Sequence, residues 1–234
     1  DPKRKKLFRI WLGATITGFT ANAFMMIAQP YAPYSSFVPA FSGIGLLSLI
    51  LFSHWKLGER ITAIEITGAV VVLFATFTFS SSVTEKEIVE VDYGALVFLV
   101  VLPLITMLTV AFFSAKRDYN AHATIWGIIS GILGGIGVSL SQTAAISSDR
   151  DLLTMGLTWD FWVAITAAAL AFSSTQYGFK HGQASIVVPI YNAVSLLIPV
   201  MIDYFVLDVI IPLTQLTSLL FIRFGTGLIT AFRQ

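Results

Sequence analysis

Residues 122–146, HATIWGIISGILGGIGVSLSQTAAI, form a stretch of twenty-five residues without Lys, Arg, Asp or Glu. At 1.5 Å per residue, a helix of this length reaches about 37 Å, which exceeds the roughly 30 Å hydrocarbon core of a bilayer. Seven comparable apolar stretches surround it along the chain. The sequence therefore predicts eight membrane-spanning helices, at residues 7–28, 35–53, 61–82, 93–114, 122–146, 158–179, 185–206 and 211–232.

The composition agrees with an all-α integral membrane protein. Hydrophobic residues make up 56% of the chain and charged residues 12%, whereas soluble domains carry about 25% charged residues. The absence of cysteine excludes disulfides, thiolate metal sites and a cysteine nucleophile. Because the connecting loops are short, no separate soluble catalytic domain is expected, and the chain is not predicted to be an enzyme or to bind nucleic acid.

The positive charges predict the orientation of these helices. With the N-terminus in the cytoplasm, only Lys86 and Arg150 lie on the outer side, while Arg223 lies within a span. The remaining positive residues lie on the cytoplasmic side: Lys3, Arg4, Lys5, Lys6, Arg9, Lys56, Arg60, Lys116, Arg117, Lys180 and Arg233. This asymmetry follows the positive-inside rule and predicts that both termini are cytoplasmic.

The second half of the chain repeats part of the first. Aligned without a gap, residues 35–76 and 185–226 share ten of forty-two positions, including Pro39 with Pro189 and Leu57 with Leu207. The offset pairs helices that are five spans apart, so the two copies would cross the membrane in opposite directions. Inverted repeats of this kind are typical of secondary transporters, whose site lies near the midplane between the repeats.

The repeat divides the chain into three parts. Residues 1–82 form a first repeat of three helices, residues 83–92 an outer acidic loop, and residues 93–234 a second repeat of five helices. Because two helices precede the second copy and none precedes the first, the symmetry predicts that one or two N-terminal helices are missing.

Several motifs resemble a known family. HWKLGERITAIEITGAVVVLFATF (residues 54–77) and YGFKHGQASIVVPIYNAVSLLIPVMIDYFVLD (residues 177–208) resemble the EamA-like proteins of the drug/metabolite transporter superfamily. The stretches GFTANAFMMIAQPYAPYSSFVPAFSG and SIVVPIYNAV are more similar to its NIPA-type, magnesium transporter-like branch. The resemblance implies transport, of which magnesium is one expected substrate. The second half departs from the pattern, since Asp208 replaces the Gly-Glu-Arg element.

Charged residues within the predicted spans are costly and usually have a reason. Asp203 is expected to bind a cationic substrate or a proton, or else to lie at the outer interface. Arg223 is expected to act as a gate or counter-ion, or else to extend towards the cytoplasm. Glu59 and Arg60 match the end-of-helix pair of the superfamily and suit either gating or a turn-stabilising ion pair.

Uncharged polar residues within the spans predict the substrate site, because they need partners where water is scarce. The predicted site lies between the helices at 7–28, 35–53, 158–179 and 185–206. Its candidate lining residues are Asn22, Gln176, Tyr177, Tyr191, Asn192, Ser195 and Asp203. Pro39 and Pro189 lack a backbone amide, so each would leave a carbonyl of the preceding turn without its hydrogen bond beside this site. They are expected to serve a gating or structural role.

The glycines of residues 122–146 have a different interpretation. Gly127, Gly131 and Gly135 follow one another at a spacing of four, which lets helix backbones approach closely and favours packing over a ligand role. No metal-ligand spacing connects the three histidines, and no cofactor is predicted. The apolar helices at 61–82 and 211–232 suit packing or homodimer contacts.

Three functions remain open at this stage. The first is a secondary transporter that moves a small organic solute across the cell membrane by alternating access. The second is a magnesium or divalent-cation transporter, and the third is a non-transporting membrane subunit or scaffold. The lipid bilayer is the expected partner in each.

Overall fold

The structure, a computed structural model, describes residues 62–81, 91–116, 122–181 and 184–231 without interruption. Before residue 62 it describes shorter pieces, of which 27–32 and 37–41 are the longest. The described residues form helices and connections, and no strand occurs among them. The expected all-α class is therefore confirmed for this part of the chain.

The helices follow the predicted segments closely. They are α4 (Ala63–Ser81), α5 (Tyr93–Ala115), α6 (His122–Ser147), α8 (Trp159–His181), α9 (Ala184–Phe205) and α10 (Leu213–Ala231). Each begins and ends within two residues of its prediction. About half of the predicted helix at 7–28 is described, in separate pieces that are all helical, and the short η1 (Gln29–Tyr31) follows it. The predicted helix at 35–53 lies mostly outside the described residues, and the short α2 (Phe37–Ala40) lies within it.

The connection between α6 and α8 contains a short helix that the apolar pattern did not predict, α7 (Leu152–Met155). The side chain of Asp151 caps it by accepting from the backbone amides of Leu153 and Thr154, at 3.5 and 3.1 Å. The backbone amide of Thr154 contributes most to holding the pKa of the Asp151 carboxyl below its ordinary value. Polar capping, rather than hydrophobic periodicity, therefore defines this helix.

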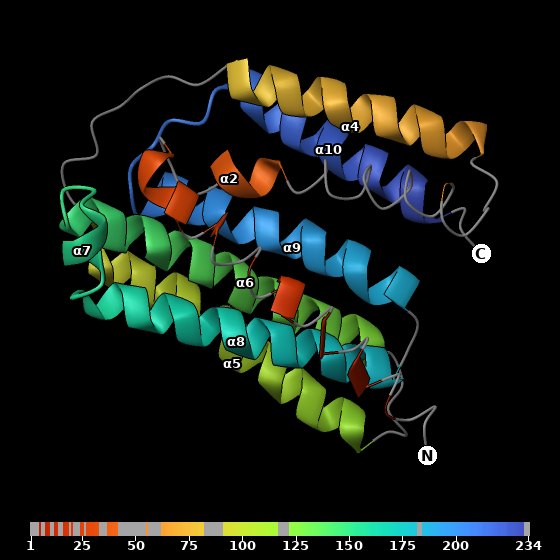
Figure 1. Cartoon of the computed structure of the whole chain (residues 1–234), viewed down its shortest axis with the longest axis horizontal. Helices are drawn as coiled ribbons and strands as arrows, with labels where there is room; N and C mark the ends of the chain where they lie inside the picture. Colours follow the sequence, from red (N-terminus) through yellow and green to blue (C-terminus); the bar gives the residue numbers. More distant parts are fainter. Residues whose placement is uncertain are drawn as a thin grey trace.

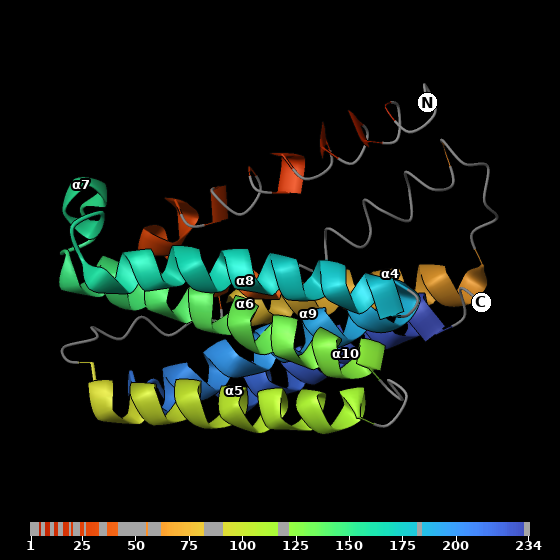
Figure 2. The same cartoon turned by 90° about the horizontal axis from the view of Figure 1, so that it is seen from below.

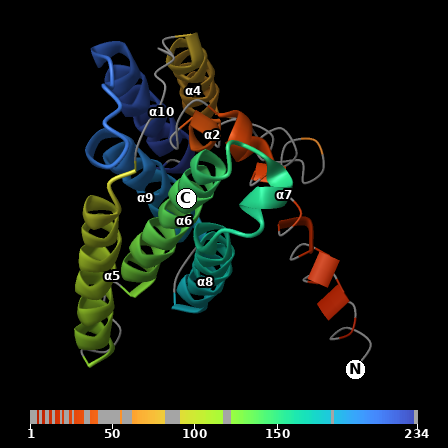
Figure 3. The same cartoon turned by 90° about the vertical axis from the view of Figure 1, so that its left-hand side faces the viewer.

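Helix α6 lies at the centre of the structure. It packs along both α8 and α9, and α5 packs against it more loosely (Figure 1). Of the described helices, α5 and α6 are long and apolar enough to cross a membrane; most of α6 is buried by other helices, whereas α5 is largely exposed. The end-on view in Figure 3 shows α5, α6 and α8 as neighbouring columns.

The spacing of glycines explains how closely α6 approaches α9. A Cβ atom added to Gly131 would lie 2.6 Å from the Cβ of Val194, and one added to Gly135 would lie 2.7 Å from the Cβ of Ile198. At Gly127 the nearest atom of Ile190 would lie at 3.2 Å. The prediction that these glycines serve packing is confirmed.

Helices α4 and α10 form a separate pair, seen along the top of Figure 1 and again, behind α9, in Figure 2. Their outer faces carry exposed aromatic side chains, including Phe74, Phe77, Phe221 and Phe224. This pair leaves α6, α8 and α9 to enclose the candidate site.

Candidate functional site

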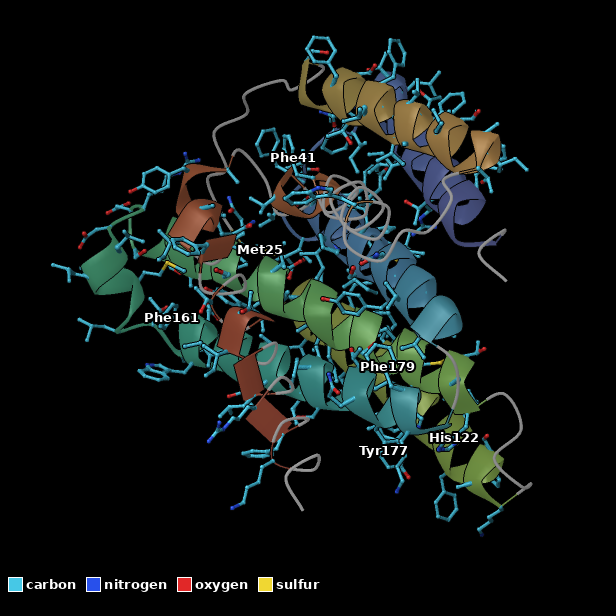
Figure 4. The ribbon with its side chains drawn as sticks, turned by 45° about the vertical axis from the view of Figure 1, so that its right-hand side comes forward. Met25, Phe41, His122, Phe161, Tyr177 and Phe179 are labelled. Carbon is cyan, nitrogen blue, oxygen red and sulfur yellow. The ribbon has the colours of Figure 1, made fainter. Side chains whose placement is uncertain are left out.

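A cavity of about 270 Å³ lies between α6, α8 and α9. Met25 and Gln29, from the first part of the chain, also line it, and Figure 4 shows the labelled Met25 beside the bundle. The lining combines small residues, two aromatic rings and several neutral polar groups. Its residues are Met25, Gln29, Gly134, Gly137, Val138, Ser141, Ala164, Ala168, Ala171, Phe172, Thr175, Gln176, Tyr191, Asn192 and Ser195.

One wall of the cavity comes from α9. Tyr191, Asn192 and Ser195 all line it, as the spacing of i, i+1 and i+4 along a helix allows. The Ser195 hydroxyl donates to the backbone carbonyl of Asn192 at 3.2 Å. The Tyr191 hydroxyl oxygen would lie 3.2 Å from a Cβ at Gly134, so the absence of a side chain on α6 makes room for this ring.

The opposite wall comes from α8. Ala164, Ala168 and Ala171 keep the space open because their side chains are small, and Phe172 adds an aromatic surface. Gln176 also lines the cavity, as does Thr175, whose hydroxyl donates to the carbonyl of Ala171 at 2.9 Å.

A buried amide cluster lies beside the cavity on α6. Gln29 donates to the side-chain oxygen of Gln142 at 3.2 Å, and Gln142 in turn donates to the carbonyl of Ala32 at 3.2 Å. Ser141, which is buried and lines the cavity, has no hydrogen-bond partner for its hydroxyl oxygen. A buried hydroxyl without a partner is unfavourable, so Ser141 would gain from a ligand or water in the cavity.

The cavity carries no formal charge. Among the described residues that line it there is no Asp, Glu, Lys, Arg or His. It can therefore hold a ligand through neutral oxygen and nitrogen atoms and through contact with aromatic rings, but not through an ion pair.

The structure thus brings together Gln176, Tyr191, Asn192 and Ser195 from the predicted site. Tyr177 lies elsewhere, with its ring centroid 4.6 Å from that of Trp126 and 5.9 Å from that of His122 (Figure 4). Asp203 is fully buried in α9 and does not line the cavity.

Arg223 lies on α10, where its guanidinium donates to the backbone carbonyl of Ala193 on α9. It therefore ties the α4–α10 pair to the helix that lines the cavity. The predicted residues Asn22, Glu59 and Arg60 lie outside the described residues. The same holds for the side chains of Pro39, in α2, and Pro189, in α9.

The contribution of α6 was missed by the sequence analysis. Gly134, Gly137 and Ser141 line the cavity, at a spacing of three and four that places them on one face of a helix. The small residues on this face of α6 could have indicated a cavity, but the sequence analysis assigned the glycines of this helix to packing alone. The predicted contribution of residues 35–53 cannot be compared with the cavity, because most of them lie outside the described residues.

The chain is similar to a curated protein of Arabidopsis thaliana that is described as a probable magnesium transporter, NIPA9. The identity is 24% over 188 residues, which cover 76% of this chain and 54% of that protein. The chain thus spans about half the length of the relative that it matches. No protein-family model and no solved structure matches the chain. The relative is described as a probable transporter, which agrees with the expectation that this chain is not an enzyme, and its description falls within the NIPA-type branch that the motifs resemble.

Proposed function

We propose that the chain is part of a membrane transporter for magnesium or a similar divalent cation, and that the cation passes through the cavity between α6, α8 and α9. The relative described as a probable magnesium transporter supports the substrate. The observation that carries the proposal is the ring of neutral polar groups around a cavity in an otherwise apolar helix bundle. Polar groups inside membrane bundles often mark substrate or ion pathways.

The neutral lining suits a cation that keeps its water. Mg²⁺ loses water reluctantly and is commonly bound with several waters still attached. Six waters at roughly 30 Å³ each fill about 180 Å³, which is less than the 270 Å³ of the cavity. The amide oxygens of Gln176 and Asn192 and the hydroxyl of Ser141 can accept hydrogen bonds from these waters.

The transport cycle that we propose is alternating access. In it, eight helices cross the membrane with both termini in the cytoplasm, and the two repeats rock against each other. The cavity, lined by α6, α8 and α9 of the second repeat and by Met25 and Gln29 of the first, then opens to either side of the membrane in turn.

A small organic solute is the second candidate substrate. The observation in its favour is the aromatic character of the lining, since Phe172 and Tyr191 both face the cavity. Pockets for organic ligands are usually apolar and aromatic, with a few polar groups that fix orientation. The third alternative, a non-transporting subunit, would leave the cavity without a transported ligand.

Flux through proteoliposomes tests the proposal. The full-length protein is reconstituted, and uptake of Mg²⁺ is followed with a trapped fluorescent indicator beside uptake of a panel of amino acids and amines. We expect Mg²⁺ flux that falls at least several-fold in Asn192→Ala, with folded protein unchanged. Flux of an organic solute without Mg²⁺ flux would favour the second candidate, and no flux of any kind would favour the third.

A further inference from the structure

A buried carboxylate lies at the end of α8 nearest α7. Asp160 is 1% exposed, and its Oδ1 atom has no hydrogen-bond partner. Its Oδ2 atom accepts a long hydrogen bond, 3.4 Å from the hydroxyl of Tyr93 on α5. Figure 4 labels the neighbouring Phe161 at this end of the bundle, far from Tyr177 and His122. Within the part of the chain that the structure describes, no Lys, Arg or His forms an ion pair with Asp160.

Three hydroxyl groups surround Asp160. Besides that of Tyr93, the hydroxyls of Thr143 and Ser147 on α6 lie within hydrogen-bonding reach of this carboxylate. A hydroxyl has a single hydrogen, and both residues donate theirs to the backbone of α6. Thr143 donates to the carbonyl of Leu140 at 2.9 Å, and Ser147 to that of Thr143 at 2.6 Å.

This arrangement is unfavourable for an isolated anion and favourable for a bound cation. A buried carboxylate with one oxygen atom unpartnered and no counter-charge is destabilised. A carboxylate with nearby hydroxyl oxygens is, in contrast, the kind of ligand set that hard divalent cations prefer, and Mg²⁺ is often held by one carboxylate while it keeps several waters.

The position of Asp160 relates it to the cavity. Ala164, four residues further along α8, lines the cavity, so Asp160 lies on the same face one turn away, at a rise of about 6 Å. The charge asymmetry of the loops places this end of α8 on the outer side of the membrane. The carboxylate therefore supplies, at the outer end of the cavity, the negative charge that the cavity lacks.

We propose that Asp160, with the hydroxyl oxygens of Tyr93, Thr143 and Ser147, forms a second cation site one helical turn outside the cavity. The identity of its ligand as a divalent cation rests on the proposed function. The site attracts the cation, which keeps several of its waters, before it enters the neutral cavity.

Equilibrium binding tests this site without requiring transport. Titration of the purified full-length protein with MgCl₂ in a calorimeter is compared for wild type, Asp160→Asn and Asp151→Asn. We expect at least tenfold weaker binding, or the loss of one bound ion, in Asp160→Asn. The matched control Asp151→Asn removes an exposed carboxylate that caps α7 and should bind as wild type does. Wild-type binding by Asp160→Asn would overturn the proposal.

A second measurement uses the wild-type protein, in case Asp160→Asn does not fold. Dicyclohexylcarbodiimide converts a protonated, apolar-buried carboxyl into an N-acylurea, which mass spectrometry detects on the peptide that contains Asp160. We expect millimolar Mg²⁺ to slow this modification several-fold, whereas unchanged or absent modification would overturn the proposal. Binding at Asp160 without Mg²⁺ flux would refute the proposed transport alone, and Mg²⁺ flux with unaltered binding in Asp160→Asn would refute the site alone.

Discussion

Gly225 of α10 lies directly against the backbone of Gly68 on α4. A Cβ atom at Gly225 would lie 2.7 Å from the carbonyl oxygen of Gly68 and 2.7 Å from Cγ2 of Val72. Real Cβ atoms do not approach a backbone oxygen this closely, so the α4–α10 pair requires glycine at residue 225. Two residues further along the same helix, a Cβ at Gly227 would meet nothing within 4 Å.

We therefore expect Gly225→Ala to lower the free energy of unfolding by about 1–3 kcal/mol through overpacking. Gly227→Ala is the matched control and should be neutral or stabilising by less than about 1 kcal/mol, because Ala favours helix over Gly. Unfolding in mixed detergent and SDS micelles measures both. Equal stability of the two variants would contradict the observed contact.

A second prediction concerns the open wall of the cavity. Ala168 lines the cavity, whereas the side chain of its neighbour Ala169 is exposed on the surface of α8. We expect Ala168→Leu to fill part of the space and reduce flux at least fivefold, and Ala169→Leu to leave it unchanged. Reconstituted uptake normalised to folded protein is the measurement. A normal rate in Ala168→Leu would show that the substrate does not pass this wall.

A third prediction concerns the buried amides of Gln29 and Gln142. Because they share a hydrogen bond of 3.2 Å, a double-mutant cycle with Gln29→Ala and Gln142→Ala should give a coupling free energy of about 0.5–1.5 kcal/mol. The single variants and the double variant are compared by unfolding in mixed micelles. Purely additive losses would mean that the two amides do not stabilise each other.

A fourth prediction concerns the turn after α9. Asp208 has a φ angle of 49°, in the left-handed region that Gly adopts freely and that Asp adopts more readily than β-branched residues do. We expect Asp208→Val to destabilise the protein by about 1–3 kcal/mol and Asp208→Gly to remain closer to wild type. Thermal unfolding in detergent ranks the two, and the reverse order would refute the backbone explanation.

A fifth prediction concerns the orientation of the chain in the membrane. The protein contains no native cysteine. A single cysteine substituted for Asp149 or for Lys116, which are both exposed, therefore shows on which side of the membrane that residue lies. A membrane-impermeant maleimide should label residue 149 from outside intact cells and residue 116 only after the cells are opened. Outside labelling of residue 116 would invalidate the proposed topology.

The turn at Asp208 lies where the second half departs from the sequence pattern. Asp208 aligns with Gly58 at the 150-residue offset and replaces the Gly-Glu-Arg element there. The structure shows that the position requires a left-handed backbone after a helix. Glycine and aspartate both adopt this backbone more readily than most residues, and Gly58 itself lies outside the described residues.

The sequence alone determined the helices. Runs of about twenty apolar residues form helices in any apolar environment because their backbone hydrogen bonds are local, so α4 to α6 and α8 to α10 were predictable to within two residues. The polar residues Tyr191, Asn192 and Ser195 were identifiable for a similar reason, since the helical repeat alone places them on adjoining faces.

Only the tertiary structure decided which helices meet. Whether the small residues of α6 pack against a neighbour or border a cavity depends on which face of α6 each one occupies and on what lies opposite. Gly131 packs against Val194 and does not line the cavity, whereas Gly137, which also lies close to the α8 backbone at Ala164, and Ser141 both line it. Asp160 gave no sequence signal beyond that of an acidic residue near a helix end. Its burial beside Tyr93, Thr143 and Ser147 arises because three helices converge there, and contacts between residues so distant in the chain follow from packing and not from any local pattern.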